Sequence, residues 1–358
     1  METKNQINTI LGTPDYIEYL RGKKATFLLS LSTTKTHEIQ GITQAGIPGL
    51  IHLTPTLDSE FVCSGEVRCL ENLAETPKGV PTPALMTRAV HLLKPFSNIE
   101  ILDLGMSKKP NLEYFKIHDF GLSPSEAINK GAKIDAMTLF QKGVEFGKNY
   151  ECSDDYIILA ESVPGGTTTA YATAVALGYD CAGKFSSSFK NAPTSIKEET
   201  IKEALENIKD KDDLFEKVGE VADNMLIFNA GFILGNASSK TKLILAGGTQ
   251  MAAVLLLTNA IVNYMGGKLE SENLALCTTK WVDQDENSDI KALLEMLDFP
   301  INAYSANFDF SHSNHPALKL YDDGEAKEGV GAGGALCYGF INGLNAQQIT
   351  TQVENFLG

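Results

Sequence analysis

A glutamate set among glycines is the first feature of this sequence that suggests chemistry. Glu328 lies in the segment GEAKEGVGAGGAL, residues 324–336, directly before Gly329 and three positions before Gly331. Glycine neighbours leave space for a planar ligand near the carboxylate, and partial burial would raise its pKa into the range that suits a general base. The alternative is a surface glutamate in a charged turn, because four of the six preceding residues are charged. The residues alone leave both interpretations open.

A second group of residues has the composition of an anion site. The segment IILAESVPGGTTTA, residues 157–170, joins an apolar run to a helix of small residues through a glycine-rich turn. Such a turn presents backbone N–H groups at the positive end of the helix dipole, and threonine hydroxyls add donors. An acidic residue stands at the carboxyl edge of the strand, where ligands bind in open α/β sheets. The candidate residues are Glu161, Gly165, Gly166, Thr167 and Thr168. A tight turn that needs glycine for a positive φ and threonine as an N-cap is the alternative.

A third glycine turn follows the apolar run 242–246 and precedes another helix of small residues. It consists of Gly247, Gly248 and Thr249. None of the glycine-rich segments shows G-x-G-x-x-G opening a helix after the first strand with an acidic residue about 20 positions further on, and none has the G-K-[ST] of a P-loop. Their absence argues against a hydride-transfer enzyme and against a nucleoside triphosphatase.

Metal and redox chemistry have little support in the sequence. The six cysteines contain no C-x-x-C pair, and we interpret them as buried thiols. His312 and His315 have the spacing of two ligands on one helix face, but no third ligand stands near them. We therefore expect no metal site, and a loop or capping role for these histidines.

Composition and charge argue against two classes of partner. The 358 residues carry a formal net charge of −15, which opposes binding to the phosphates of nucleic acids. No window holds the roughly 18–20 uninterrupted apolar residues that span a bilayer. The nearest, residues 243–264, is interrupted by glycines and polar residues, and the first 24 residues lack an apolar core of signal-peptide length. We expect a cytoplasmic protein with no nucleic-acid or membrane partner.

Short apolar runs that alternate with helical segments must position these residues. The pattern predicts strands over residues 26–31, 47–53, 99–104, 114–120, 156–160, 242–246, 274–282 and 301–306. It predicts helices over residues 15–20, 81–93, 135–147, 167–177, 195–209, 215–234, 250–265, 289–297 and 345–356. Ser195 and Glu198 have the spacing of a capping box. Such alternation favours an α/β fold with a parallel, Rossmann-like sheet flanked by helices on both faces.

Two of these motifs together resemble those of a known family. Residues 160–178, AESVPGGTTTAYATAVALG, and residues 327–336, KEGVGAGGAL, resemble the approximate motifs E-M-G-I-G-N-T-T-A-A and R-L-G-E-G-T-G-A. These are core motifs of the nicotinate-nucleotide:dimethylbenzimidazole phosphoribosyltransferase family of cobamide synthesis. Residues 243–257 resemble its strand ending in D-G-F with the following helix, and residues 311–318, SHSNHPAL, resemble its S-A-E-P-G-H. The similarity covers residues 150–358 and is closest to a divergent branch of the family.

The resemblance implies a role for each candidate residue. Glu328 matches the family's catalytic base, Gly329 and Gly331 its flanking glycines, and Glu161 its ribose-contacting glutamate. The phosphate-binding turn falls on Gly165, Gly166, Thr167 and Thr168. In D-G-F, the glycine falls on Gly247 and the phenylalanine on Gly248, and Thr249 follows. The family's phosphate-contacting lysine has three candidates, which are Lys184, Lys190 and Lys197.

The sequence departs from the family at several of these positions. Gly166 replaces the family's asparagine, Val163 replaces a glycine and Ala246 replaces the aspartate of D-G-F. Residues 325–327, Glu-Ala-Lys, replace the Arg-Leu-Gly before the base. These departures motivate a second hypothesis, a nucleotide-binding protein of the same fold without transferase activity. A transferase that uses phosphoribosyl pyrophosphate is a third.

By resemblance, the first hypothesis is an enzyme that moves phosphoribose from nicotinate mononucleotide to a benzimidazole-type base. The products would be an α-ribazole phosphate and nicotinate, and no cofactor would be needed beyond the mononucleotide substrate. The expected organisation is a large α/β domain over residues 25–310 that holds the nucleotide. Residues 1–24 and 311–358 would form a small helical subdomain that carries Glu328. The resemblance also implies a homodimer.

Overall fold

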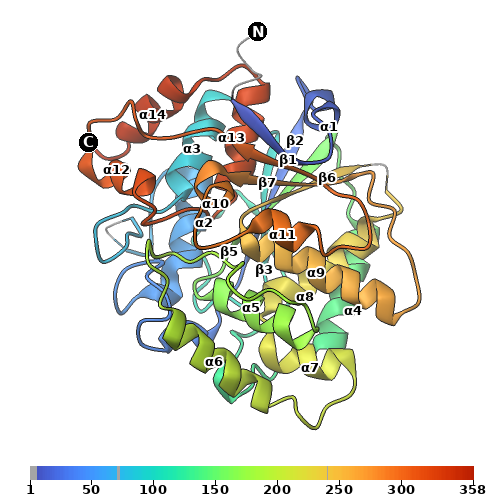
Figure 1. Ribbon diagram of the computed structural model, residues 1–358. Helices are drawn as coiled ribbons and strands as arrows, with labels where there is room; N and C mark the ends of the chain where they lie inside the picture. The colour runs from blue at the N-terminus through green and yellow to red at the C-terminus, as the bar shows by residue number, and fades with distance from the viewer. Residues whose placement is uncertain (1–5, 71–72, 240) are drawn as a thin grey trace.

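The computed structural model describes residues 6–70, 73–239 and 241–358, which fold around one eight-stranded sheet (Figure 1). The strand order is β1-β8-β7-β6-β5-β2-β3-β4, and only the pairing of β1 with β8 is antiparallel. The strands are β1 (Ile7–Leu11), β2 (Ala25–Leu31), β3 (Asn98–Asp103), β4 (Lys116–Asp119), β5 (Tyr156–Ser162), β6 (Lys242–Ala246), β7 (Leu274–Thr279) and β8 (Asn302–Ala306). The predicted parallel, Rossmann-like sheet is confirmed.

Helices cover both faces of the sheet. One face carries α2 (Thr54–Ser64), α3 (Ala84–Leu93), α13 (Ala332–Ile341) and α14 (Ala346–Glu354). The other carries α4 (Ala136–Asn149), α5 (Gly166–Ala176), α7 (Leu214–Val221), α8 (Asn224–Asn236), α9 (Thr249–Tyr264) and α11 (Ile290–Leu294). The remaining helices are α1 (Asp15–Tyr19), α6 (Thr194–Glu206), α10 (Lys280–Asp283) and α12 (Pro316–Asp322).

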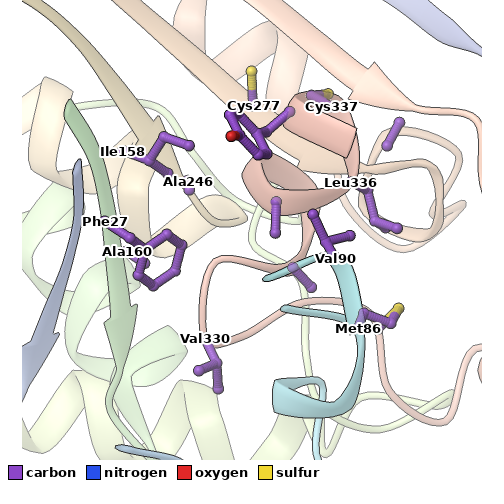
Figure 2. Packing of buried hydrophobic residues seen from close by; sticks show 14 of the residues in the cluster. Phe27, Met86, Val90, Ile158, Ala160, Ala246, Cys277, Val330, Leu336 and Cys337 are labelled. Atoms are coloured by element: carbon purple, nitrogen blue, oxygen red, sulfur yellow. The ribbon is translucent and has the colours of Figure 1, made fainter. Parts of the chain in front are cut away.

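Alternation along the buried strands separates the two halves of the core. On β5, Ile158 and Ala160 face the α3 and α13 side, whereas Leu159 faces α8 and α9. The residues of β2, β5 and β7 are buried without exception, as expected for central parallel strands covered on both faces. Val330, which belongs to the same half of the core as Ile158 and Ala160, lies on the loop that leads into α13 (Figure 2).

Four local predictions are wrong for identifiable reasons. Residues 47–53 are not a strand; a 3₁₀ turn, Ile51–Leu53, leads into α2, because a proline at the first turn starts a helix as readily as it stops a strand. Residues 215–234 form two helices, because Asp223 caps a new one. Helix α6 starts after Pro193 with no side-chain cap, so the Ser195 capping box is absent. Strand β7 ends at Thr279, where α10 begins.

The chain ends also contribute to the sheet and to its cover. Strand β1, which the sequence pattern did not predict, pairs with β8 at the sheet edge, and α13 packs across β6, β7 and β8. The division into a domain over 25–310 and a subdomain of 1–24 and 311–358 stays a prediction, and residues 1–5 lie outside the described residues. Within the described ranges, no helix has both the length and the apolar character that a membrane span requires.

The sheet has one switch point that matters for function. The chain runs from β2 outward to β3 and β4, and then returns to β5 on the other side of β2 before it continues through β6, β7 and β8. The connections after β2 and β5 therefore diverge at the carboxyl ends of these two strands. Open α/β sheets bind ligands in the crevice at such a point.

Candidate active site

Two adjoining cavities open at the carboxyl edge of the sheet. The glycine cavity is lined by residues 43, 45, 161, 163, 165–167, 186–188, 248–250, 327 and 328. The proline cavity is lined by Pro81, Pro83 and Pro164 together with residues 45, 46, 54, 58, 74–76, 80, 82, 161–163, 188, 250 and 325–330. Glu161 and Glu328 line both, so the two carboxyl groups stand where the cavities meet.

Backbone donors hold the carboxylate of Glu328. Its Oε1 accepts from the N–H of Gly333 at 3.0 Å, and its Oε2 accepts from the N–H of Thr279 at 2.9 Å. These donors lie in the first turn of α13 and at the start of α10, where helix dipoles favour a negative charge. Burial outweighs these donors and raises the pKa of Glu328 to about 7. A group with this pKa can accept a proton near neutral pH.

Glu161, near the end of β5, is only 2% exposed. Burial, followed by the negative charges of Glu328 and Asp223, raises its pKa to about 8. Glu161 therefore holds a proton at pH 7 while Glu328 is partly ionised. Because like charges at one buried site disfavour each other, ionisation of Glu328 opposes ionisation of Glu161.

The predicted glycine turn lies at the N-terminus of α5. Gly165 has a φ of +82° as the N-cap, a conformation that favours glycine. The N–H groups of Gly166 and Thr168 donate within the turn, to the carbonyls of Val163 and Gly165. Gly165, Gly166 and Thr167 line the glycine cavity, whereas Thr168 is fully buried and its hydroxyl has no partner among the described residues.

Of the three candidate lysines, the structure brings Lys197 to this turn. Its Nζ donates to Thr167 Oγ1 at 3.1 Å and to the carbonyl of Ser186 at 3.4 Å. The side chain is buried, and burial together with the positive charge of Lys327 lowers its pKa to about 8. Lys190 instead lines a separate surface depression near Trp281.

The turn after β6 lies between the two glutamates. A Cβ at Gly247 would lie 3.7 Å from Oε1 of Glu161, and one at Gly248 would lie 3.5 Å from Cβ of Glu328. Thr249 Oγ1 accepts from the N–H of Ser186 at 3.2 Å and so joins this turn to the serine segment 186–188. Gly248 and Thr249 line the glycine cavity.

The glycines after Glu328 pack against the sheet instead of opening space for a ligand. A Cβ at Gly331 would lie 2.5 Å from Cβ of Ala160, and one at Gly334 would lie 2.4 Å from Cβ of Ala246. Figure 2 shows these two alanines on their strands. Close approach of α13 is what places the N–H of Gly333 on the Glu328 carboxylate. Of the two flanking glycines, Gly329 lines the proline cavity.

Asp58 is a carboxyl group of the site that sequence reasoning missed. It lies on α2, is 2% exposed and lines the proline cavity. Thr82 Oγ1 and Ser162 Oγ each donate to it at 2.6 Å, and burial raises its pKa to about 6. The sequence pattern predicts a strand over residues 47–53 that ends at the following proline, and this prediction concealed helix α2. If the helix had been predicted correctly, an aspartate on its buried face would have indicated that Asp58 belongs to the site.

His312 and His315, the two histidines with the spacing of metal ligands, lie just before and at the start of α12. His315 is the N-cap residue of α12 without a side-chain cap, and His312 lies in the preceding turn. Across residues 6–70, 73–239 and 241–358, no group of three or more His, Cys, Asp or Glu side chains is arranged to hold a metal ion.

Comparisons with known proteins agree on fold and family. The chain is similar to the UPF0284 protein of Sulfurisphaera tokodaii, with 37% identity over 334 residues and 92% of each chain covered. It is 34% identical to the UPF0284 protein of Methanocaldococcus jannaschii over 348 residues, with 95% of each chain covered. No family model matches the sequence.

Two crystal structures from Thermus thermophilus share the fold at 14% identity. One is a nicotinate-nucleotide-dimethylbenzimidazole phosphoribosyltransferase, with a TM-score of 0.58 over 99% of this chain and 93% of that chain. The other, named CobT, has a TM-score of 0.59 over 96% of this chain and 92% of that chain. The fold expected from the resemblance is confirmed, and the relatives identify the chain as a member of the UPF0284 family.

Proposed function

We propose that this protein transfers the phosphoribosyl group of nicotinate mononucleotide to a nitrogen heterocycle. The observation that carries the proposal is the position of Glu161 and Glu328 at the junction of two different cavities. One cavity is lined by serine and threonine residues and by the N-terminus of α5, where the Lys197 ammonium bonds Thr167, and the other has apolar walls. A donor nucleotide and an acceptor base bound side by side would meet at these two carboxyl groups.

The glycine cavity suits the phosphate and ribose of the donor. The N-terminus of α5 supplies the helix dipole, and Thr167, Ser186 and Lys197 surround it with polar groups. The sequence has no Lys or Arg between residues 151 and 183, so the cation comes from α6. The turn itself contributes neutral donors only.

The proline cavity suits a flat heterocycle. Its apolar walls are formed by Ala74, Val80, Pro83, Ala326 and Val330, and Glu328 lines both this cavity and the glycine cavity. We propose that Glu328 takes the N–H proton of the acceptor while the other ring nitrogen attacks C1′. The C1′–N bond to nicotinate breaks, and its electron pair leaves with the pyridine ring. Attack from the face opposite the leaving group converts a β-nucleotide into an α-nucleotide.

Glu161 has a different part in the proposal. Its raised pKa keeps it protonated in the free site, so it can donate a hydrogen bond to a ribose oxygen. Glu161 keeps its proton through the step, and the carbonyl oxygen of its carboxyl group can face the positive charge that develops at C1′ and stabilise the transition state. The pyridinium of the donor already carries a positive charge, so no cofactor is invoked.

The direct test combines nicotinate mononucleotide with a panel of heterocycles. We expect release of nicotinate and an α-linked nucleotide, identified by mass and NMR. Glu328→Gln should lower kcat by about 10²-fold or more, the usual contribution of a general base. Wild-type turnover in that variant would refute the assignment of the base.

The alternative of a binding protein without transferase activity also has a structural argument. Ala246, at the position of the family's aspartate, lies beneath Gly334 with no space for a carboxylate. Mononucleotide binding without nicotinate release for any acceptor would favour this alternative. Activity that depends on phosphoribosyl pyrophosphate and is abolished by a chelator would favour the third hypothesis.

The homodimer and the cytoplasmic location belong to the same proposal, and light scattering of the purified protein tests the dimer.

A further inference from the structure

The proline cavity contains a carboxyl group that the proposed reaction does not use. Asp58 projects from α2, and its partners are the hydroxyls of Thr82 on Oδ1 and Ser162 on Oδ2. No cation pairs with it among the described residues. A buried carboxylate held by two neutral hydroxyls keeps capacity for further donors, because each oxygen has two lone pairs.

The other acidic groups of the cavity are satisfied differently. Glu325 forms an ion pair with Lys78 at 2.5 Å, and Glu328 accepts N–H bonds from two helix starts. Glu60, also on α2, does not line the cavity; it is buried and accepts three backbone N–H bonds from Arg68, Cys69 and Asn111, which is a structural role. Glu161 also lines this cavity, but the proposed reaction already uses it, whereas Asp58 is a carboxyl group there that two side-chain hydroxyls hold and that has no proposed role.

Asp58 lies close to the groups that would hold the acceptor. Burial is the main cause of the raised pKa of Glu161, and the negative charge of Asp58 contributes to it. Burial, followed by the charges of Asp58 and Glu328, also raises the pKa of Tyr321. Ser162, which donates to Asp58, is the residue after Glu161. A heterocycle whose ring N–H meets Glu328 therefore has its remaining edge within the same small cavity as Asp58.

We infer that Asp58 selects an acceptor base that carries a second hydrogen-bond donor, such as an amino or hydroxyl substituent, in addition to its ring N–H. This inference rests on the proposed function, since it names the acceptor class of that reaction. A methyl substituent at the same place would leave the carboxylate buried without a ligand donor. Sites built to bond a polar group discriminate strongly against analogues that lack it.

The test measures binding, so that it does not depend on turnover. Calorimetry compares 5-aminobenzimidazole with 5-methylbenzimidazole, and the 4-substituted pair, on the wild-type protein with nicotinate mononucleotide present. We expect one amino compound to bind at least about tenfold more tightly than its methyl counterpart. Equal dissociation constants in both pairs would overturn the inference.

Two variants locate the effect. Asp58→Asn should abolish the preference, because the amide can turn its own N–H₂ toward the ligand. Asp103→Asn changes another buried carboxylate, which bonds the N–H groups of Gly105 and Met106 outside the cavity, and should keep the preference. A preference retained in Asp58→Asn also overturns the inference. If the amino compounds bind as expected but no nicotinate is released, the transferase proposal fails and the binding inference stands.

Discussion

The Nζ of Lys197 lies 3.1 Å from the Oγ1 of Thr167, and this contact joins helix α6 to the glycine turn 30 positions earlier in the chain. The ammonium has no carboxylate partner among the described residues, although its side chain is buried. A buried cation without a counter-charge is costly unless a ligand compensates it. The cation therefore points to an anion that binds at the start of α5.

We expect Lys197→Met to weaken mononucleotide binding by tenfold or more, about 1.4 kcal/mol, because the phosphate loses its cation. Titration calorimetry measures the dissociation constant. Lys202→Met, on the exposed side of the same helix, is the matched control and should bind as the wild type does. Wild-type affinity should also fall above pH 8, where Lys197 loses its charge. Unchanged affinity in Lys197→Met would remove this lysine from the site.

The pH dependence of turnover should report Glu328. Because its pKa is raised to about 7, kcat/KM should rise with pH until the carboxyl is ionised, with the limb centred near pH 7. Thr278 Oγ1 donates weakly to Oε2, at 3.4 Å, and favours the charged form. Thr278→Val should therefore move the limb to higher pH. A limb that stays in place, or that moves down, would contradict the assignment.

Stability should respond to pH through Glu161. Its pKa is 4.5 in an unfolded chain and about 8 in the folded protein, so the folded state binds the proton more tightly. Stability from this group is present below pH 4.5 and is lost as the pH rises through 8. Urea unfolding measures the free energy of unfolding at pH 5 and at pH 8. The decrease between these two pH values should be smaller in Glu161→Gln than in the wild type, by about 1 kcal/mol or more. Glu203→Gln, exposed on α6, should follow the wild type.

Those parts of the site that lie within one continuous segment could be predicted from the sequence. The glycine turn and Glu161 follow from one continuous segment, in which an apolar run, an acid and small residues succeed one another. Strands β2, β3, β5, β6 and β8 could be predicted for the same reason. Strands β2, β5 and β6 are mainly apolar runs bounded by polar residues or turns, whereas β3 and β8 carry apolar residues among polar ones.

Contacts between distant segments could not be predicted. Asp58 bonds Ser162, which lies 104 positions away in the sequence. Helix α2 was not predicted, because a proline such as Pro55 can either end a strand or begin a helix. Strand β1 has only five residues, and its pairing with β8 joins segments almost 300 positions apart. The glycines of α13 could be seen in the sequence. Their function, close packing on the sheet, needed the neighbouring strands.

That packing gives a prediction on stability. A Cβ at Gly333 would lie 2.1 Å from the carbonyl carbon of Thr278, a backbone atom that cannot move aside. We expect Gly333→Ala to destabilise the protein by about 1–3 kcal/mol, as overpacked cores do. Gly267→Ala is the control, because its Cβ would meet nothing closer than 3.7 Å. A melting temperature equal to that of the wild type would show that α13 does not depend on this close approach.

The last prediction concerns the glycine turn itself. A Cβ at Gly166 would lie 1.9 Å from Oε1 of Gln250, an oxygen with no hydrogen-bond partner among the described residues. The Gly166 N–H already donates to Val163, so the effect of a side chain at position 166 is steric.

We expect Gly166→Val to fold and to bind the mononucleotide at least tenfold more weakly, about 1.4 kcal/mol. The side chain can act by filling the cavity or by displacing Gln250, and the double variant Gly166→Val with Gln250→Ala separates these effects. Gln250→Ala alone gives the baseline. If the valine obstructs the ligand directly, affinity stays low in the double variant, because the space left by Gln250 does not remove the valine methyl groups from the turn. Recovery to the baseline would assign the loss to Gln250. Wild-type affinity in Gly166→Val itself would show that the turn does not contact the nucleotide.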